Sequence, residues 1–148
     1  MKDTSTPASA RALGIVLLVA AAFIVVYWLV WFGNRNLVAA AHTDTYYAFV
    51  SSFPVPDVWL ALSTALAGVL LVRGNPTAIF VQFLAGGVGI YNGLLAAIFD
   101  LENGVLVGRG GAGSVTPILE LSLTLVTLAL SSFGLGWAWR HRAWVTTA

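Results

Sequence analysis

The chain has 148 residues, of which 59% are hydrophobic and only 9% are charged. Soluble domains average about half apolar and about a quarter charged residues, so this composition indicates an integral membrane protein. The formal net charge of +1 argues against nucleic-acid binding, and the absence of cysteine excludes disulfide frameworks and thiolate chemistry.

Four apolar stretches are long enough to cross a bilayer as helices. They cover about residues 12–33, 57–72, 77–99 and 116–139, between polar tails at 1–11 and 143–148. Because each crossing needs about 20 residues, four crossings and their connections leave no room for a separate soluble domain. We therefore predict an all-α, polytopic membrane protein in which residues 12–142 form a single four-helix bundle.

The first predicted span ends in Tyr27, Trp28 and Trp31, whose rings favour the bilayer interface. A cleaved signal peptide is the alternative, since residues 39–41 fit a small-residue cleavage site. Secretory apolar cores have about 7–15 residues, whereas this stretch is longer and rich in tryptophan. A retained helix is the preferred interpretation.

The connection between the first two spans is unusually aromatic, with two tyrosines and two phenylalanines in residues 45–53. Thr43 or Asp44 is suited to cap a short helix here. Such a helix would lie along the membrane interface with its rings toward the apolar side. It would either anchor the chain at the interface or cover the outer end of the bundle as a lid.

The second predicted span is short for a full crossing. It begins at Asp57, directly after Pro56, and ends before a tight turn at residues 73–76. Either the bilayer thins locally or Phe53 and Val55 enter the apolar zone. A glycine-rich connection over residues 100–114 then separates the third and fourth spans.

The distribution of basic residues predicts the orientation. With the N-terminus in the cytoplasm, five basic residues lie on the cytoplasmic side and two on the other: Lys2, Arg11, Arg73, Arg140 and Arg142 against Arg35 and Arg109. Cytoplasmic loops of membrane proteins carry an excess of Lys and Arg. We therefore predict a plasma-membrane protein with both termini in the cytoplasm and most acidic residues near the outer face.

Small and polar residues form one stripe on each of the last three predicted helices, at helical spacing. The stripes are Asp57, Ala61, Thr64 and Gly68; Gln82, Gly86, Gly89 and Gly93; and Glu120, Thr124, Thr127 and Ser131. Small residues let helix backbones approach closely in lipid. The stripes are therefore predicted to form the bundle core, with their four glycines as helix-packing positions.

Carboxylates inside predicted spans mark a candidate site in the outer half of the bundle. Glu120 lies about one turn into the fourth span, and Asn92 lies about 12 Å below the outer end of the third. The alternatives are structural: Asp57 as a helix N-cap, and Glu120 as a favourable charge at a helix start. The candidate ligand-binding residues are Asp57, Trp59, Tyr91, Asn92, Glu120 and Thr124, with Asp57 and Glu120 also candidate catalytic residues.

The sequence contains no cofactor or metal signature. Neither His42 nor His141 lies in a span, so intramembrane bis-histidine haem ligation lacks its ligands. Ser-His-Asp, HExxH and EF-hand patterns are absent. We therefore expect no cofactor and no metal site.

Three functions follow from these residues. The preferred one is binding of a lipophilic small molecule or a membrane-protein partner, including a second copy of the chain, through the outer half of the bundle. The second is an acid–base enzyme of isomerase or cyclase type acting on an isoprenoid or lipid, with Glu120 and Asp57 as acid and base. In that enzyme Tyr91 or Trp59 would shield a cationic intermediate.

The third function is a small proton-coupled exporter in which Glu120 titrates. Four spans and one membrane carboxylate resemble the small multidrug transporters in outline. Their acid lies in the first span, however, and the first predicted span here has none.

Overall fold

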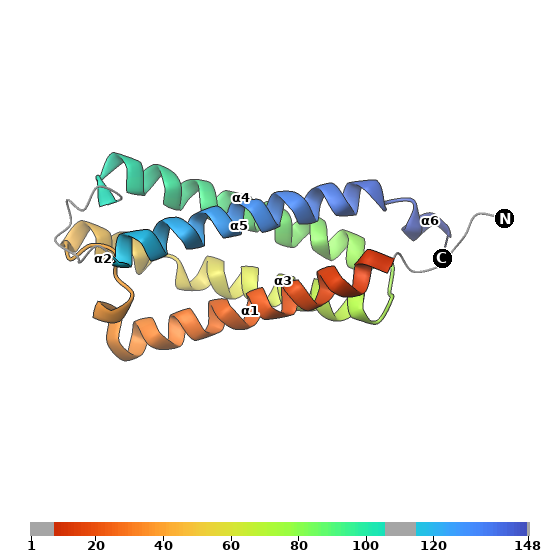
Figure 1. Cartoon of the computed structure of the whole chain (residues 1–148), viewed down its shortest axis with the longest axis horizontal. Coiled ribbons are helices and arrows are strands. Elements are labelled where there is room, and N and C mark those ends of the chain that lie inside the picture. The colour runs from red at the N-terminus through yellow and green to blue at the C-terminus, as the bar shows by residue number, and fades with distance from the viewer. Residues whose placement is uncertain (1–7, 106–114, 148) are drawn as a thin grey trace.

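A computed structural model describes residues 8–105 and 115–147, and every regular element in these ranges is helical (Figure 1). In chain order they are α1 (Ala8–Asn34), the 3-10 helix η1 (Arg35–Leu37), α2 (Asp44–Val50), α3 (Pro54–Val72), α4 (Ala78–Glu102), α5 (Val115–Arg140) and α6 (Trp144–Thr147). The prediction of an all-α bundle of four long helices is confirmed. Most of the predicted 100–114 connection, together with Lys2 and Arg109, lies outside the described residues.

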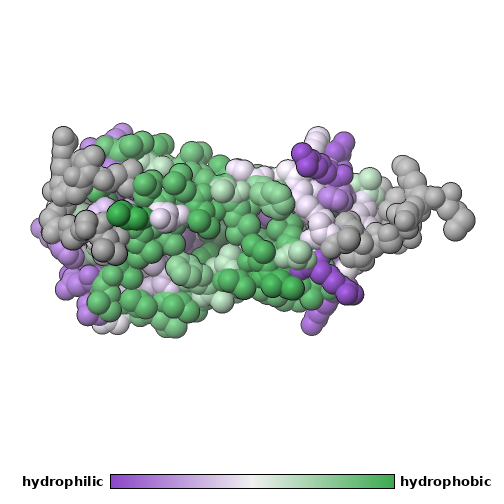
Figure 2. Space-filling model, viewed as in Figure 1, coloured by the Kyte–Doolittle hydropathy of each residue, from purple (hydrophilic) through white to green (hydrophobic). Residues whose placement is uncertain are grey.

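Four segments of the described chain are long and apolar enough to cross a membrane: Ser9–Leu37, Asp44–Val72, Ala78–Glu102 and Thr116–Arg140. Large hydrophobic side chains such as Leu29, Phe32 and Phe133 are exposed along them. Figure 2 shows the resulting hydrophobic band, with hydrophilic residues gathered at the two ends of the bundle. The chain is therefore a multi-pass membrane protein.

The start of α1, the turn between α3 and α4, and α6 lie at one end of the bundle, which we call the terminal end (Figure 1). The opposite end carries α2 and is called the α2 end. Thr43 is the N-cap of α2, and its hydroxyl accepts a hydrogen bond from the Tyr46 amide. The predicted short helix is therefore present, with Thr43 rather than Asp44 as its cap.

Helix α3 begins three residues earlier than predicted, which resolves the apparent shortness of the second span. Its 19 residues reach about 28 Å at 1.5 Å each, close to the thickness of a bilayer core of about 30 Å. Pro54 and Pro56 occupy its first turn, where a missing N–H costs little. Phe53 is the N-cap and makes no side-chain capping bond, so the N-cap interpretation of Asp57 is wrong.

The helices pack in the order α1, α3, α4, α5, with each helix against the next. The approach of α1 to α3 is closest at Gly14 and Gly68. A Cβ added to Gly68 would lie 2.9 Å from the Gly14 carbonyl oxygen, and one added to Gly14 would lie 2.8 Å from the Gly68 oxygen. Glycine at both positions lets these two backbones touch.

The glycine stripe of α4 faces α5. A Cβ at Gly86 would lie 2.6 Å from Cγ of Leu135, and one at Gly89 would overlap the hydroxyl of Ser131. A Cβ at Gly93 would lie 2.8 Å from a leucine of α5. These three glycines therefore set the short distance between α4 and α5.

Helices α1 and α5 are joined at the terminal end rather than along their length. At the terminal end, Trp137 Nε1 donates to Ser9 Oγ at 2.8 Å, within a buried cluster of side chains from all four long helices and α6. At the α2 end, a second buried cluster contains Trp28, Trp31 and Tyr46. Between these clusters, the two helices do not pack closely against each other.

Candidate functional site

A cavity of about 130 Å³ lies inside the α2 end of the bundle, lined by α1, α2, α3, α4 and α5. Its polar non-aromatic lining consists of Asp57, Asn92, Glu120, Thr124 and Thr127. Four of the six predicted ligand-binding residues therefore meet in one place, although they come from three different helices. Asp57, Glu120 and Thr124 belong to polar stripes that face the bundle core, and Asn92 lies beside one.

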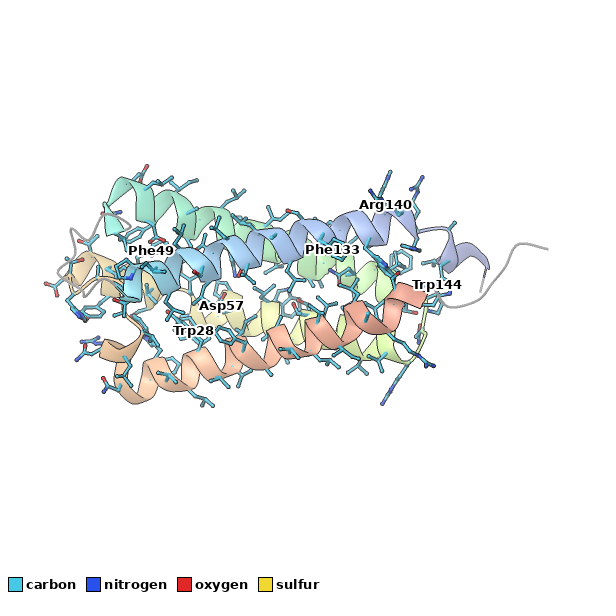
Figure 3. All side chains as sticks on the ribbon, in the orientation of Figure 1. Trp28, Phe49, Asp57, Phe133, Arg140 and Trp144 are labelled. Atoms are coloured by element: carbon cyan, nitrogen blue, oxygen red, sulfur yellow. The ribbon has the colours of Figure 1, made fainter. Side chains whose placement is uncertain are left out.

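Asp57 is held by two donors from two other helices. Its Oδ2 accepts a hydrogen bond from Trp28 Nε1 of α1 at 3.0 Å, and its Oδ1 accepts one from Asn92 Nδ2 of α4 at 2.9 Å. Figure 3 shows Trp28 and Asp57 side by side between α1 and α3, on the side of the α2 end. Since both carboxylate oxygens are paired, Asp57 is a fixed part of the cavity wall.

Glu120 is held much more loosely. Helix α5 starts at Val115, so Glu120 lies beyond the first turn, and the interpretation of Glu120 as a helix-start charge is wrong. Its Oε2 accepts one long hydrogen bond of 3.5 Å from the Tyr46 hydroxyl. The residues described by the structure provide no other hydrogen bond to this carboxylate, which leaves it free to accept a donor inside the cavity.

Tyr46 connects α2 to the cavity. Its side chain is almost completely buried, and its hydroxyl accepts a hydrogen bond of 3.1 Å from the Ala40 amide while donating to Glu120. Phe49, labelled in Figure 3, and Phe53 also line the cavity. Three of the four aromatic residues of this connection, Tyr46, Phe49 and Phe53, therefore point into the bundle rather than only along the membrane interface.

A larger groove continues the cavity toward the middle of the bundle. It has a volume of about 420 Å³ and lies between α1 and α5, with α3 and α4 as its floor. Phe23, Leu60 and Thr127 line both spaces, so the groove adjoins the cavity. Figure 2 looks onto the seam between α5 and α1, where hydrophilic residues show between the hydrophobic ones.

The groove also contains an unsatisfied amide. Gln82 is 1% exposed, lies against Gly134 of α5, and lines the floor of the groove. Its Oε1 is buried and has no hydrogen-bond partner in the described part of the chain. The sequence predicts Gln82 on the inward face of the third span, but it does not predict that this amide oxygen lacks a hydrogen-bond partner among the described residues.

Trp59 and Tyr91 are not brought to the cavity. They are 55% and 65% exposed and line a shallow, outward-facing groove between α3 and α4. Both were predicted as ligand-binding residues whose rings would shield a cationic intermediate. The ring that does reach Asp57 is Trp28, whose buried indole N–H needs an acceptor; its place at the end of the first span had indicated only an interfacial anchor.

Within residues 8–105 and 115–147, no group of three or more histidine, cysteine or acidic side chains is placed to hold a metal ion. Comparison with protein-family models, curated proteins and solved structures found no match to this chain. The function must therefore be argued from the cavity and its groove.

Proposed function

We propose that the protein binds a lipophilic small molecule with one polar end, inside the bundle. The observation that supports this most is a cavity with polar side chains that adjoins a larger apolar groove. The polar end of the molecule would reach Asp57, Asn92 and Glu120, and its apolar part would lie in the groove between α1 and α5. Apolar pockets with a few convergent polar groups are typical ligand sites.

The polar end of such a ligand would determine its selectivity. A hydrocarbon chain gains little by moving from lipid into an apolar groove, because both surroundings are equally apolar. A site built to hydrogen-bond a polar group, in contrast, rejects molecules that leave its buried partners unpaired. The candidate selectivity residues are therefore the carboxylates and amide of the cavity rather than the walls of the groove.

We also propose a plasma-membrane location with the α2 end outside. In support, Arg11, Arg73, Arg140 and Arg142 lie at the terminal end, while Arg35 lies at the α2 end. This asymmetry fits the enrichment of basic residues on the cytoplasmic side of membranes. The ligand site then belongs to the outer half of the membrane.

A second candidate function is acid–base catalysis on a lipid or isoprenoid. The observation that favours it is that both carboxylates line the same apolar cavity. With Asp57 paired to Trp28 and Asn92, the loosely held Glu120 would be the group that exchanges a proton with the substrate. Glu120→Gln would then abolish product formation without preventing binding, whereas a binding protein forms no product.

Binding is tested by photolabelling in phosphatidylcholine nanodiscs. The probes are three amphiphiles with the same twelve-carbon chain and a diazirine on that chain, carrying ammonium, hydroxyl or carboxylate heads. At least one probe should label groove residues of α1 and α5, as mapped by peptide mass spectrometry. Labelling spread evenly over all lipid-facing residues with every probe would overturn the proposal.

The chain offers a matched pair of variants for this experiment. Ala20 lines the groove, whereas Ala22, two residues further along α1, is exposed on the lipid side. Ala20→Phe should fill the groove and remove most of the specific labelling, and Ala22→Phe should leave it unchanged. Equal labelling of both variants would contradict a ligand site in the groove.

A further inference from the structure

The two carboxylates of the cavity have different hydrogen-bonding environments. Asp57 has both oxygens occupied by protein donors at 2.9 and 3.0 Å. Glu120 has one contact of 3.5 Å, to Tyr46, and its other oxygen has no hydrogen-bond partner among the described residues. A bound molecule that donates hydrogen bonds would therefore find its acceptor at Glu120.

The charge of the cavity is also unbalanced. Among residues 8–105 and 115–147, no lysine, arginine or histidine lines either the cavity or the groove. An ionised carboxylate in apolar surroundings is costly unless a cation or strong donors compensate it. For Asp57 the described residues supply two donors, whereas for Glu120 they supply only the Tyr46 hydroxyl.

Aromatic rings form much of the remaining wall. Tyr27 and Trp28 of α1, Phe49 of α2, and Phe53 all line the same cavity as Glu120. The faces of aromatic rings attract cations, and surrounding rings are a recurring way to bind substituted ammonium groups. They provide no compensation for an anion, which the two carboxylates would also repel.

We infer that the polar end of the ligand is an organic ammonium group, with Glu120 as its counter-ion and the aromatic rings around it. This inference depends on the proposed binding function and specifies its ligand class: a lipophilic amine. The cavity volume of about 130 Å³ leaves room for a single amine head, whereas a phosphate-bearing head group would meet two carboxylates among the described lining residues. The chain of the amine would extend from the cavity into the groove.

The same three twelve-carbon probes test the inference. In wild-type protein at equal mole fraction of probe, the ammonium probe should occupy the groove about tenfold more tightly than the hydroxyl probe. The carboxylate probe should bind least. Equal occupancy by the ammonium and hydroxyl probes, or preference for the carboxylate, would overturn the ammonium assignment while leaving groove labelling, and hence the binding function, intact.

Variants identify the counter-ion. Glu120→Gln should remove the preference for the ammonium probe, so that the ammonium and hydroxyl probes bind about equally. The hydroxyl probe should still label the groove. Glu102→Gln is the matched control, because Glu102 is an exposed carboxylate at the same end of the bundle and outside the cavity. If Glu102→Gln lowers the preference as much as Glu120→Gln does, the cation is attracted by surface charge and the inference fails.

The wild-type ranking of the three probes requires no substitution, so the inference remains testable if Glu120→Gln does not fold. Tryptophan fluorescence of each variant during thermal unfolding verifies its folding, since the chain has six tryptophans. A folded Glu120→Gln protein that keeps the full ammonium preference would exclude Glu120 as the counter-ion.

Discussion

Asp57 has the most complete hydrogen bonding of the cavity carboxylates because two neighbouring helices donate to it. In lipid, a buried carboxylate without partners has no water to replace them. The contacts to Trp28 and Asn92 therefore fix the positions of α1 and α4 around α3 as well as the direction of the carboxylate. The same two hydrogen bonds therefore hold the helices together and shape the proposed ligand site.

Replacing Asn92 should destabilise the fold. Asn92→Leu keeps the branching and the number of heavy atoms of the side chain but leaves Oδ1 of Asp57 without a donor, which costs about 1–3 kcal/mol. The change in the free energy of unfolding is measured in detergent, with tryptophan fluorescence as the signal. Tyr91→Leu is the control: Tyr91 is exposed on the same helix, and its replacement should change the stability by less than about 0.5 kcal/mol. Equal stability of the two variants would contradict the role of the Asp57–Asn92 bond.

Sequence reasoning brought Asp57, Asn92 and Glu120 together but misplaced Trp59 and Tyr91. The first three belong on or beside polar stripes, and polarity in a membrane helix indicates the inward face. Trp59 follows Asp57 by two residues, which is about 200° around a helix of 3.6 residues per turn. Trp59 therefore lies on the opposite face of the helix from Asp57. Tyr91 directly precedes Asn92, so the two side chains point in directions about 100° apart.

Among the elements, the glycine contacts decide how closely the helices approach. Gly68 and Gly14 bring α3 and α1 together, and the α4 glycines bring α4 to α5. No comparable contact draws α1 to α5. The groove exists because three helix pairs pack closely and the fourth pair does not.

Adding a methyl group at Gly68 should loosen the pair α1–α3. In Gly68→Ala the new Cβ would lie 2.9 Å from a backbone oxygen that has little room to move, and we expect a loss of about 1–3 kcal/mol. Gly87→Ala is the matched control, because a Cβ there meets nothing within 4 Å. It should be neutral or stabilising by up to about 1 kcal/mol, as alanine favours helix. Thermal unfolding of the two variants in one detergent distinguishes them, and an equal loss would contradict the glycine contact.

The stripes of α3, α4 and α5 were predictable because small residues at helical spacing stand out in an apolar span. Gly14 was not, since α1 is apolar on all sides and a single glycine forms no pattern. The inward direction of α2 was also left open. A short aromatic helix is compatible with an interfacial position and with a buried one. The hydrogen bonds of the Tyr46 hydroxyl to Ala40 and Glu120 show that this side chain is directed into the bundle.

At the scale of the whole molecule, the four crossings could be predicted from length and apolar composition alone. No chain of this composition can expose such spans to water, and each span has the length that a bilayer requires. The gap between α1 and α5 could not be predicted. It depends on which pairs of helices touch, and hydropathy carries no information about that choice.

The chain's lack of cysteine allows a direct test of its orientation. Thr45 is exposed on α2, and Thr77 is exposed beside the turn at the terminal end. In intact cells a membrane-impermeant maleimide should label Thr45→Cys, and it should label Thr77→Cys only after lysis, because the basic residues favour the cytoplasm. The reverse pattern would invert the proposed orientation.

The groove between α1 and α5 lies along the apolar length of the bundle, so the proposed ligand would exchange through it with the bilayer and never need to enter water. Its occupancy would then depend on the mole fraction of the amphiphile among the surrounding lipids. Rinsing with buffer would scarcely empty the proposed site, whereas fusing the membrane with ligand-free vesicles would. The reservoir of such a ligand would be two-dimensional.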